Sequence, residues 1–171
     1  MSEKSAAVAA IRSAAERLRA DCARASAAQW SARPGPDAWS VAHVAEHVAI
    51  SNRGILATLG KRVAASPLAG RATDVLDLEI PYLFYRGEEP PQVATPTGTF
   101  TQPAALDALD ASSRALLDWA EGSALDLRAV GAPHPAFGLF DGIQWLLFAA
   151  AHMERHRAQV LGLLTPLRVS S

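Results

Sequence analysis

The chain has 171 residues and a formal net charge of −1 at pH 7, from 16 Lys and Arg and 17 Asp and Glu residues. This length predicts one domain over residues 1–171, with a core that needs neither a disulfide nor a structural metal. Because the basic residues are scattered along the chain, the sequence excludes a charged surface for nucleic acid or for an anionic membrane.

The segment before Pro34 predicts the first helix. Its apolar residues recur at the three- and four-residue spacing of one buried helical face. They are Val8, Ile11, Ala15, Leu18 and Cys22. Charged residues interrupt the apolar stretches near the start, so we expect neither a secretory signal nor a membrane span. Cys22 is the single cysteine of the chain, which favours a reducing compartment and a cytoplasmic protein.

Ser40 is expected to cap a second helix that ends near Ala65. The apolar stripe of this helix consists of Val41, Val44, Val48, Ile55 and Leu59. Residues 66–101 contain five prolines and three glycines, too many for one long helix, so we expect a crossover connection with one short helix at most. Within it, Tyr82 and Tyr85 are expected to join a small apolar cluster under the loop rather than to cap a pocket.

A third helix is predicted with Pro103 in its first turn and Gly122 at its C-terminal end. Its apolar residues are Leu106, Leu109, Leu116 and Trp119. Residues 123–140 are expected to form a loop, and the last helix to run from Asp141, as N-cap, to Leu164. The sequence therefore predicts an all-α protein, a four-helix bundle with a long crossover connection between helices two and three.

Two histidines, His152 and His156, lie four residues apart in the stretch FAAAHMERHRAQV. Helical geometry places them on the same face as Trp145 and Phe148, which we assign to the core. An unpaired buried polar group costs about 1 to 3 kcal/mol, so two buried imidazoles need partners. One divalent cation would satisfy both; hydrogen bonds to carbonyls, carboxylates or buried water are the alternative. Glu154 projects about 160° from the pair and is expected at the surface.

The second helix offers a third ligand in the stretch HVAEH. His47 lies about 90° from the centre of the apolar stripe, and His43 about 130°, so His47 is the better inward candidate. We expect His43 to be exposed or to cap the helix, and Glu46 to point further outward. His134 stands between two prolines and is interpreted as a solvated loop histidine, with a place at the mouth of a site as the alternative.

Three motif blocks together resemble the DinB-like superfamily, specifically its DinB_2 group. The blocks are AWSVAHVAEHVA, PHPAFGLFDGIQ and WLLFAAAHMERHRAQV, and they agree with that group in order and separation. The resemblance implies a four-helix bundle that binds a divalent metal, either zinc or nickel, through three histidines. On this sequence the matching positions are His47, His152 and His156.

A site with three imidazole ligands leaves coordination positions open, as catalytic metal sites do. The resemblance implies a metal-dependent transferase that activates a low-molecular-weight thiol for attack on an electrophilic small-molecule substrate. A hydrolase that uses hydroxide generated at the ion, or a non-catalytic metal-binding module linked to stress, are the alternatives. We expect no nucleic-acid or membrane partner, and a homodimer is left open.

Three polar residues near the histidine pair have open roles. Arg155 and Arg157 are expected to be solvated, although either would suit a carboxylate of a thiol cofactor. Gln159 lies on the same face as the histidines and is expected either to orient an imidazole or to make an ordinary hydrogen bond between helices.

Overall fold

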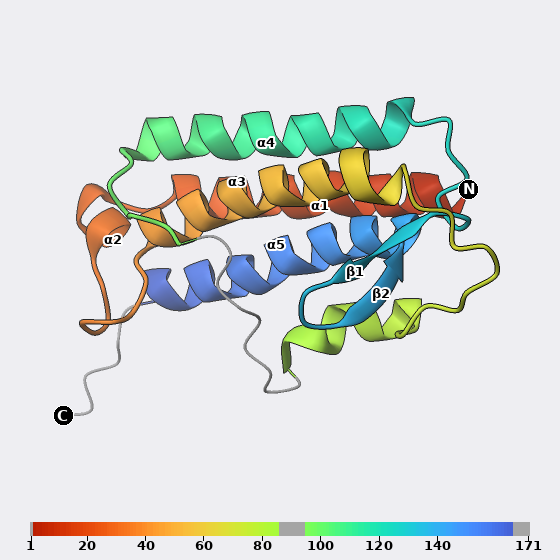
Figure 1. Cartoon of the computed structure of the whole chain (residues 1–171). Coiled ribbons are helices and arrows are strands. Elements are labelled where there is room, and N and C mark those ends of the chain that lie inside the picture. The colour runs from red at the N-terminus through yellow and green to blue at the C-terminus, as the bar shows by residue number, and fades with distance from the viewer. Residues whose placement is uncertain (1, 86–94, 166–171) are drawn as a thin grey trace.

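A computed structural model describes residues 2–85 and 95–165 of the chain. Four long helices lie side by side (Figure 1). They are α1 (Glu3–Ala23), α3 (Val41–Thr58), α4 (Gln102–Gly122) and α5 (Gly142–Leu164). Helix α1 packs against α4 and α5, and α3 packs against the same two helices, so the four enclose one core. The predicted all-α four-helix bundle is confirmed.

The direction of the helices follows from the long crossover connection. Helices α3 and α4 run in one direction and α1 and α5 in the other (Figure 1). A chain that leaves the end of α3 must return along the bundle before it begins α4. The described part of the crossover contains one short 3-10 helix, η2 (Asp77–Tyr85), in agreement with the prediction. A π-helical turn, η1 (Leu59–Val63), continues α3 almost to the predicted end near Ala65.

Side-chain caps fix the starts of the long helices where the sequence predicts them. The Ser40 hydroxyl accepts from the backbone N–H of His43, and the His43 ring bonds back to the Ser40 backbone. Asp141 and Gln144 form the same reciprocal arrangement at the start of α5. Such capping boxes satisfy backbone N–H groups that the helix itself leaves unpaired.

The core forms where the apolar faces of the four helices meet. Residues that are at most 1% exposed come from each of them. They include Ile11, Leu18, Val44, Leu59, Leu109, Leu116, Leu146 and Met153. A polar contact lies within this core: the amide of Asn52 on α3 donates to the hydroxyls of Ser112 and Ser113 on α4. Apolar burial therefore holds the bundle together, and this polar contact joins α3 to α4.

The segment before α5 contains a β-hairpin, which corrects the predicted loop. Strand β1 (Gly131–His134) pairs antiparallel with β2 (Gly138–Asp141). Gly138 adopts a φ of 82°, which favours glycine, and this lets the chain reverse after Phe137. The strand was not predicted because Pro133 lies in it and Pro135 follows it, and proline removes ladder hydrogen bonds and is unfavourable in strands. The hairpin packs against the start of α5 and brings His134 beside it.

Two further features were absent from the sequence prediction or differ from it. A five-residue helix, α2 (Ala27–Ser31), follows α1. Tyr82 is 64% exposed, so its assignment to an apolar cluster is wrong, whereas the neighbouring Leu83 is fully buried. The side chain of Tyr85 lies outside the described residues. None of the described helices has the length and apolar character needed to cross a membrane.

Candidate metal site

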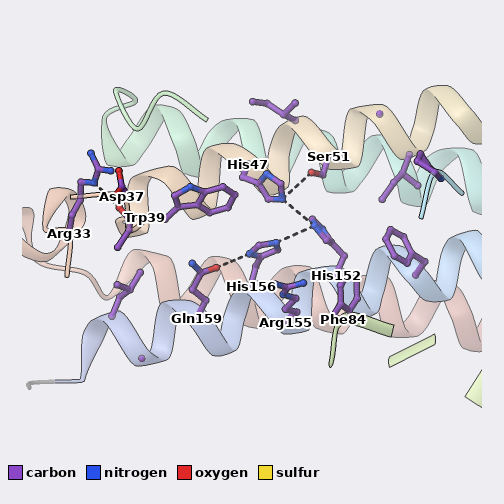
Figure 2. A pocket seen from close by; sticks show the side chains of 18 of the residues that line it. Arg33, Asp37, Trp39, His47, Ser51, Phe84, His152, Arg155, His156 and Gln159 are labelled. Atoms are coloured by element: carbon purple, nitrogen blue, oxygen red, sulfur yellow. Dashed lines mark hydrogen bonds between the residues drawn. The ribbon is translucent and has the colours of Figure 1, made fainter. Parts of the chain in front are cut away.

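Three histidine side chains from two helices point toward one another (Figure 2). The Nε2 atom of His152 lies 3.2 Å from Nε2 of His47 and 3.1 Å from Nε2 of His156. His47 comes from α3, and the other two come from successive turns of α5. The structure therefore brings together the three histidines that the sequence selected.

The N-terminal part of α3 and the segment before it hold His47 in place. The indole of Trp39 lies directly before the Ser40 cap, with its ring centre 4.7 Å from that of His47. The same indole stacks on His156, with 6.0 Å between ring centres and 18° between the planes. Trp39 thus contacts one histidine from each helix, and it covers the cluster on one side (Figure 2).

Hydrogen bonds among the three neutral imidazoles leave one buried nitrogen of the cluster without a partner. Nδ1 of His152 is buried and has no hydrogen-bond partner among the described residues. If the His152 proton sits on Nε2, this atom donates to one neighbour only and leaves the Nδ1 lone pair unpaired. If the proton sits on Nδ1, a buried N–H group lacks an acceptor. Either tautomer leaves one buried polar atom unsatisfied, a cost of about 1 to 3 kcal/mol.

A divalent cation fits this arrangement of donors. It would bind the lone pairs of all three Nε2 atoms at once, with the His152 proton on Nδ1, where this N–H group still lacks an acceptor among the described residues. Zinc-to-nitrogen bonds of about 2.0 to 2.1 Å at a tetrahedral angle place neighbouring nitrogens about 3.3 Å apart. The two separations from His152, 3.1 and 3.2 Å, are close to that value, and all three ligand atoms lie within 4.8 Å of one another. The three side chains could hold a zinc or nickel ion, since imidazole suits both metals.

Burial keeps two of the imidazoles neutral. Desolvation lowers the pKa of His156 to about 3, with a further contribution from His47. Desolvation also lowers the pKa of His152 well below its ordinary value, and the neighbouring histidines add to the effect. A neutral imidazole offers the lone pair that a metal needs, so both side chains are in the ligating form at pH 7.

Gln159 orients one imidazole of the cluster. Its side-chain oxygen lies 3.0 Å from Nδ1 of His156, one turn along α5 (Figure 2). This contact makes Nδ1 the protonated nitrogen and directs the Nε2 lone pair toward His152. Of the two predicted roles, the structure favours the orientation of an imidazole. On the other side, the Ser51 hydroxyl lies 3.4 Å from Nε2 of His47.

The histidine cluster forms part of the lining of a cleft of about 870 Å³. The cleft runs between α3 and α5, and its lining is mainly apolar and aromatic. The aromatic and basic residues of the lining include Trp39, Phe84, His134, Trp145, Phe148 and Arg155. Trp145 and Phe148 are 4% and 5% exposed, which confirms their assignment to the core although both also reach the cleft. A small molecule therefore has room beside the three Nε2 atoms.

Two predictions about polar residues near the site are wrong. Glu46 is buried rather than outward: its carboxylate accepts hydrogen bonds from the backbone N–H groups of Thr97 and Gly98. His134 is not a solvated loop residue, because it lies in β1 and packs among aromatic rings. Its alternative placement, at a site, agrees with its position in the cleft lining.

Other predictions near the site are confirmed or narrowed. His43 caps α3 through Ser40, as expected. Glu154 forms an ion pair with Arg17 at the surface. Arg157 bonds to Asp21 on α1, so it does not reach the cleft, whereas Arg155 does.

The sequence analysis missed the contribution of Phe84. Its ring, from η2, lies 5.8 Å from that of His152 and 5.3 Å from that of Phe148. No local pattern in the crossover marks this residue, because the position of η2 depends on its packing against α5. Trp39 was noted only as part of a motif, and its place directly before a capping serine was the available signal.

The sequence profile of the DinB superfamily matches residues 10–160 of this chain. The match contains α3 and α4 in full, most of α1 and α5, and the three histidines of the cluster. The searches of curated proteins and of solved structures returned no match. The profile covers well over half of the chain, and the observed bundle and histidine cluster are those that the resemblance implied. The chain belongs to the DinB superfamily.

Proposed function

We propose that this protein is a divalent-metal-dependent transferase that activates a low-molecular-weight thiol for attack on an electrophilic small molecule. One observation carries this function: three histidine Nε2 atoms, two of them on rings kept neutral by burial, converge at the lining of a cleft. A purely structural metal site is closed by its protein ligands, whereas three ligands beside an open cleft leave positions for water or substrate.

Each part of the chemistry has a residue that would perform it. His47, His152 and His156 would hold zinc or nickel, and Gln159 keeps the His156 lone pair in place. The ion would supply positive charge that favours a bound thiol as thiolate. The thiol proton passes to solvent, and the sulfur electron pair forms the new bond to carbon as the leaving group departs. Aromatic side chains line the cleft beside the cluster, and Trp39 contacts two of its histidines.

Metal content is the first test. Untagged wild-type protein, purified without chelators and without added metal, is analysed by mass spectrometry beside His156→Ala. We expect about one equivalent of zinc or nickel in the wild type and loss of that metal in the variant. His43→Ala is the matched control, because His43 caps the same helix and takes no part in the cluster. Metal absent from the wild type, and not taken up when zinc or nickel is supplied, would contradict the proposal.

Activity is the second test. Metal-loaded protein is assayed with glutathione, bacillithiol or mycothiol and an aromatic electrophile such as chlorodinitrobenzene. We expect turnover that requires both the metal and the thiol. Turnover of nitrophenyl acetate without any thiol would favour the hydrolase. Bound metal without turnover in either assay would favour the non-catalytic module.

A further inference from the structure

His134 lies in the cleft and takes no part in the histidine cluster. Its ring centre is 4.8 Å from that of Phe137 and 4.6 Å from that of Phe148. The ring also contacts Trp145. These contacts hold the imidazole in one place at the end of the cleft that the hairpin forms. A fixed polar ring among aromatic side chains has either a structural or a ligand-binding role.

The backbone decides which nitrogen of His134 carries the proton. The N–H of Ala136 donates to Nδ1 over 3.1 Å, so Nδ1 provides a lone pair and Nε2 carries the hydrogen. Within the described part of the chain this Nε2–H group has no acceptor, and Nε2 is not among the buried unpaired atoms. Burial of the ring lowers its pKa to about 4, so the ring stays neutral at pH 7. The result is a neutral hydrogen-bond donor that is open to the cleft.

Arg155 supplies a second donor in the same cleft. Its guanidinium carbon lies 5.2 Å from the centre of the Phe84 ring, a cation–π contact that fixes the side chain. The described residues place no carboxylate within ion-pair distance of it. By contrast, the guanidinium of the nearby Arg157 forms an ion pair with Asp21 at 2.7 Å. Arg155 thus presents an available positive charge beside the histidine cluster (Figure 2).

The described residues at the aromatic end of the cleft offer these two donors no carboxylate. Among the described lining residues, the one carboxylate is Asp37, and it lies with Arg33 at the opposite end from Phe84 (Figure 2). The charges of the two arginines and the one aspartate in the lining sum to +1. A ligand at the aromatic end would complement these donors with oxygen acceptors of its own, one of them charged.

We propose that the aromatic end of the cleft is a subsite for a flat, apolar carboxylate that also carries a second oxygen acceptor. Its body lies against Phe84 and Phe148, its carboxylate pairs with Arg155, and its second oxygen accepts from Nε2–H of His134. This assignment names the substrate class of the proposed enzyme and so rests on that function. The contacts themselves involve none of the three clustered histidines, so the subsite is testable in metal-free protein.

Three related probes separate the two contacts in binding titrations followed by NMR. Para-acetylbenzoate carries both a carboxylate and a carbonyl oxygen, benzoate lacks the carbonyl, and acetophenone lacks the carboxylate. We expect para-acetylbenzoate to bind most tightly. Arg155→Gln is expected to weaken para-acetylbenzoate and benzoate about tenfold and to leave acetophenone unchanged. His134→Phe keeps the ring contacts and is expected to weaken para-acetylbenzoate and acetophenone severalfold, with benzoate unchanged.

Controls keep the outcome decisive. Arg114→Gln on α4 removes an arginine outside the cleft and should change no affinity. The nitrogen shifts of His134 in wild-type protein should show a protonated Nε2 and an unprotonated Nδ1, which tests the tautomer even if His134→Phe fails to fold. Three outcomes would contradict the proposed subsite. They are equal affinities for the three probes, no binding of any probe, and affinities that neither substitution changes.

The metal proposal and the subsite can fail separately. All titrations are run on metal-free and on metal-loaded protein, with His156→Ala as a third sample. Dependence on Arg155 and His134 in the metal-free sample supports the subsite even if the metal test fails. If para-acetylbenzoate binds only in the presence of the metal, and Arg155→Gln leaves its affinity unchanged, the carboxylate is a metal ligand. The proposed subsite would then be wrong.

Discussion

The Nε2 atoms of His47 and His152 lie 3.2 Å apart, although 105 residues separate the two histidines in the chain. This contact exists only when α3 and α5 are packed together. An ion bound there therefore stabilises the folded state at the expense of the unfolded chain. The stability of the whole bundle becomes a measure of metal binding.

Metal is expected to raise the thermal stability of the wild type but not of His47→Ala. At a free metal concentration one hundred times Kd, the gain in unfolding free energy is about 2.7 kcal/mol. Scanning calorimetry with zinc, nickel or a chelator measures the change in Tm. His43→Ala should respond to metal as the wild type does. An equal gain in His47→Ala would show that the metal binds elsewhere.

Gln159→Leu is expected to weaken metal binding about ten- to one-hundredfold, because the His156 ring loses the acceptor that fixes its tautomer. Competition with a chromogenic chelator measures the affinity. Gln29→Leu, in the short helix α2 outside the cleft, is the matched control and should leave the affinity unchanged. Equal affinities for Gln159→Leu and the wild type would reduce this contact to an ordinary hydrogen bond.

Metal-free protein is expected to lose stability as the pH falls below about 6.5. The folded pKa is about 3 for His156 and about 4 for His134, and that of His152 is also lowered, all mainly by burial. The unfolded chain regains a histidine pKa near 6.5. Below that pH the unfolded chain binds more protons than the folded one, so acid favours unfolding.

At pH 5 each of these histidines should cost about 2 kcal/mol of unfolding free energy relative to pH 7.5. Urea unfolding at the two pH values measures the difference. His134→Phe should show a smaller loss, since it removes one titrating group. Unfolding free energies that are equal at both pH values would mean that the imidazoles are not desolvated as described.

Glu46→Gln is expected to destabilise the fold by about 1 to 3 kcal/mol. The substitution replaces a buried carboxylate oxygen by an NH₂ group that faces the backbone N–H groups of Thr97 and Gly98. Denaturant unfolding measures the change, with Glu154→Gln as an exposed control that should stay within about 0.5 kcal/mol. If both variants match the wild type, the contact between α3 and the crossover contributes little to stability.

Arg128→Ala is expected to destabilise the fold by about 2 to 3 kcal/mol. The guanidinium bonds to the carboxylates of Glu3, Asp77 and Asp141, and it lowers the pKa of Asp77. Asp141 is buried, so the loss of Arg128 leaves its charge without that partner. Arg12→Ala breaks an exposed pair with Glu121 and should cost less than about 1 kcal/mol. Similar losses for the two variants would contradict this difference.

The helices were predictable because their signals are local. The spacing of apolar residues and the caps at Ser40 and Asp141 fix α3 and α5 without reference to the rest of the chain. The histidine pair on α5 follows from the same helical geometry. The prediction of His47 as a ligand also assumed that the apolar stripe of α3 faces the core. This assumption was correct for His47.

The errors occur where distant segments pack on a helix. Glu46 lies outside the apolar stripe of α3, yet residues near the end of the crossover cover it and supply its hydrogen bonds. Gly98 makes this approach possible: its φ is 68°, and a Cβ there would collide with the His43 ring. His134 was misplaced for a similar reason, because its hairpin is fixed by packing on α5. Periodicity describes one helix at a time and cannot report such contacts.

The distance between the two halves of the histidine cluster along the chain also sets an order of events during synthesis. At about 5 to 20 residues per second, the ribosome adds His152 about 5 to 20 seconds after His47. During that interval the α3 half of the site exists alone, and α5 follows every other described helix. An ion that needs all three imidazoles could therefore be bound only after the last of the described helices has been made and has docked.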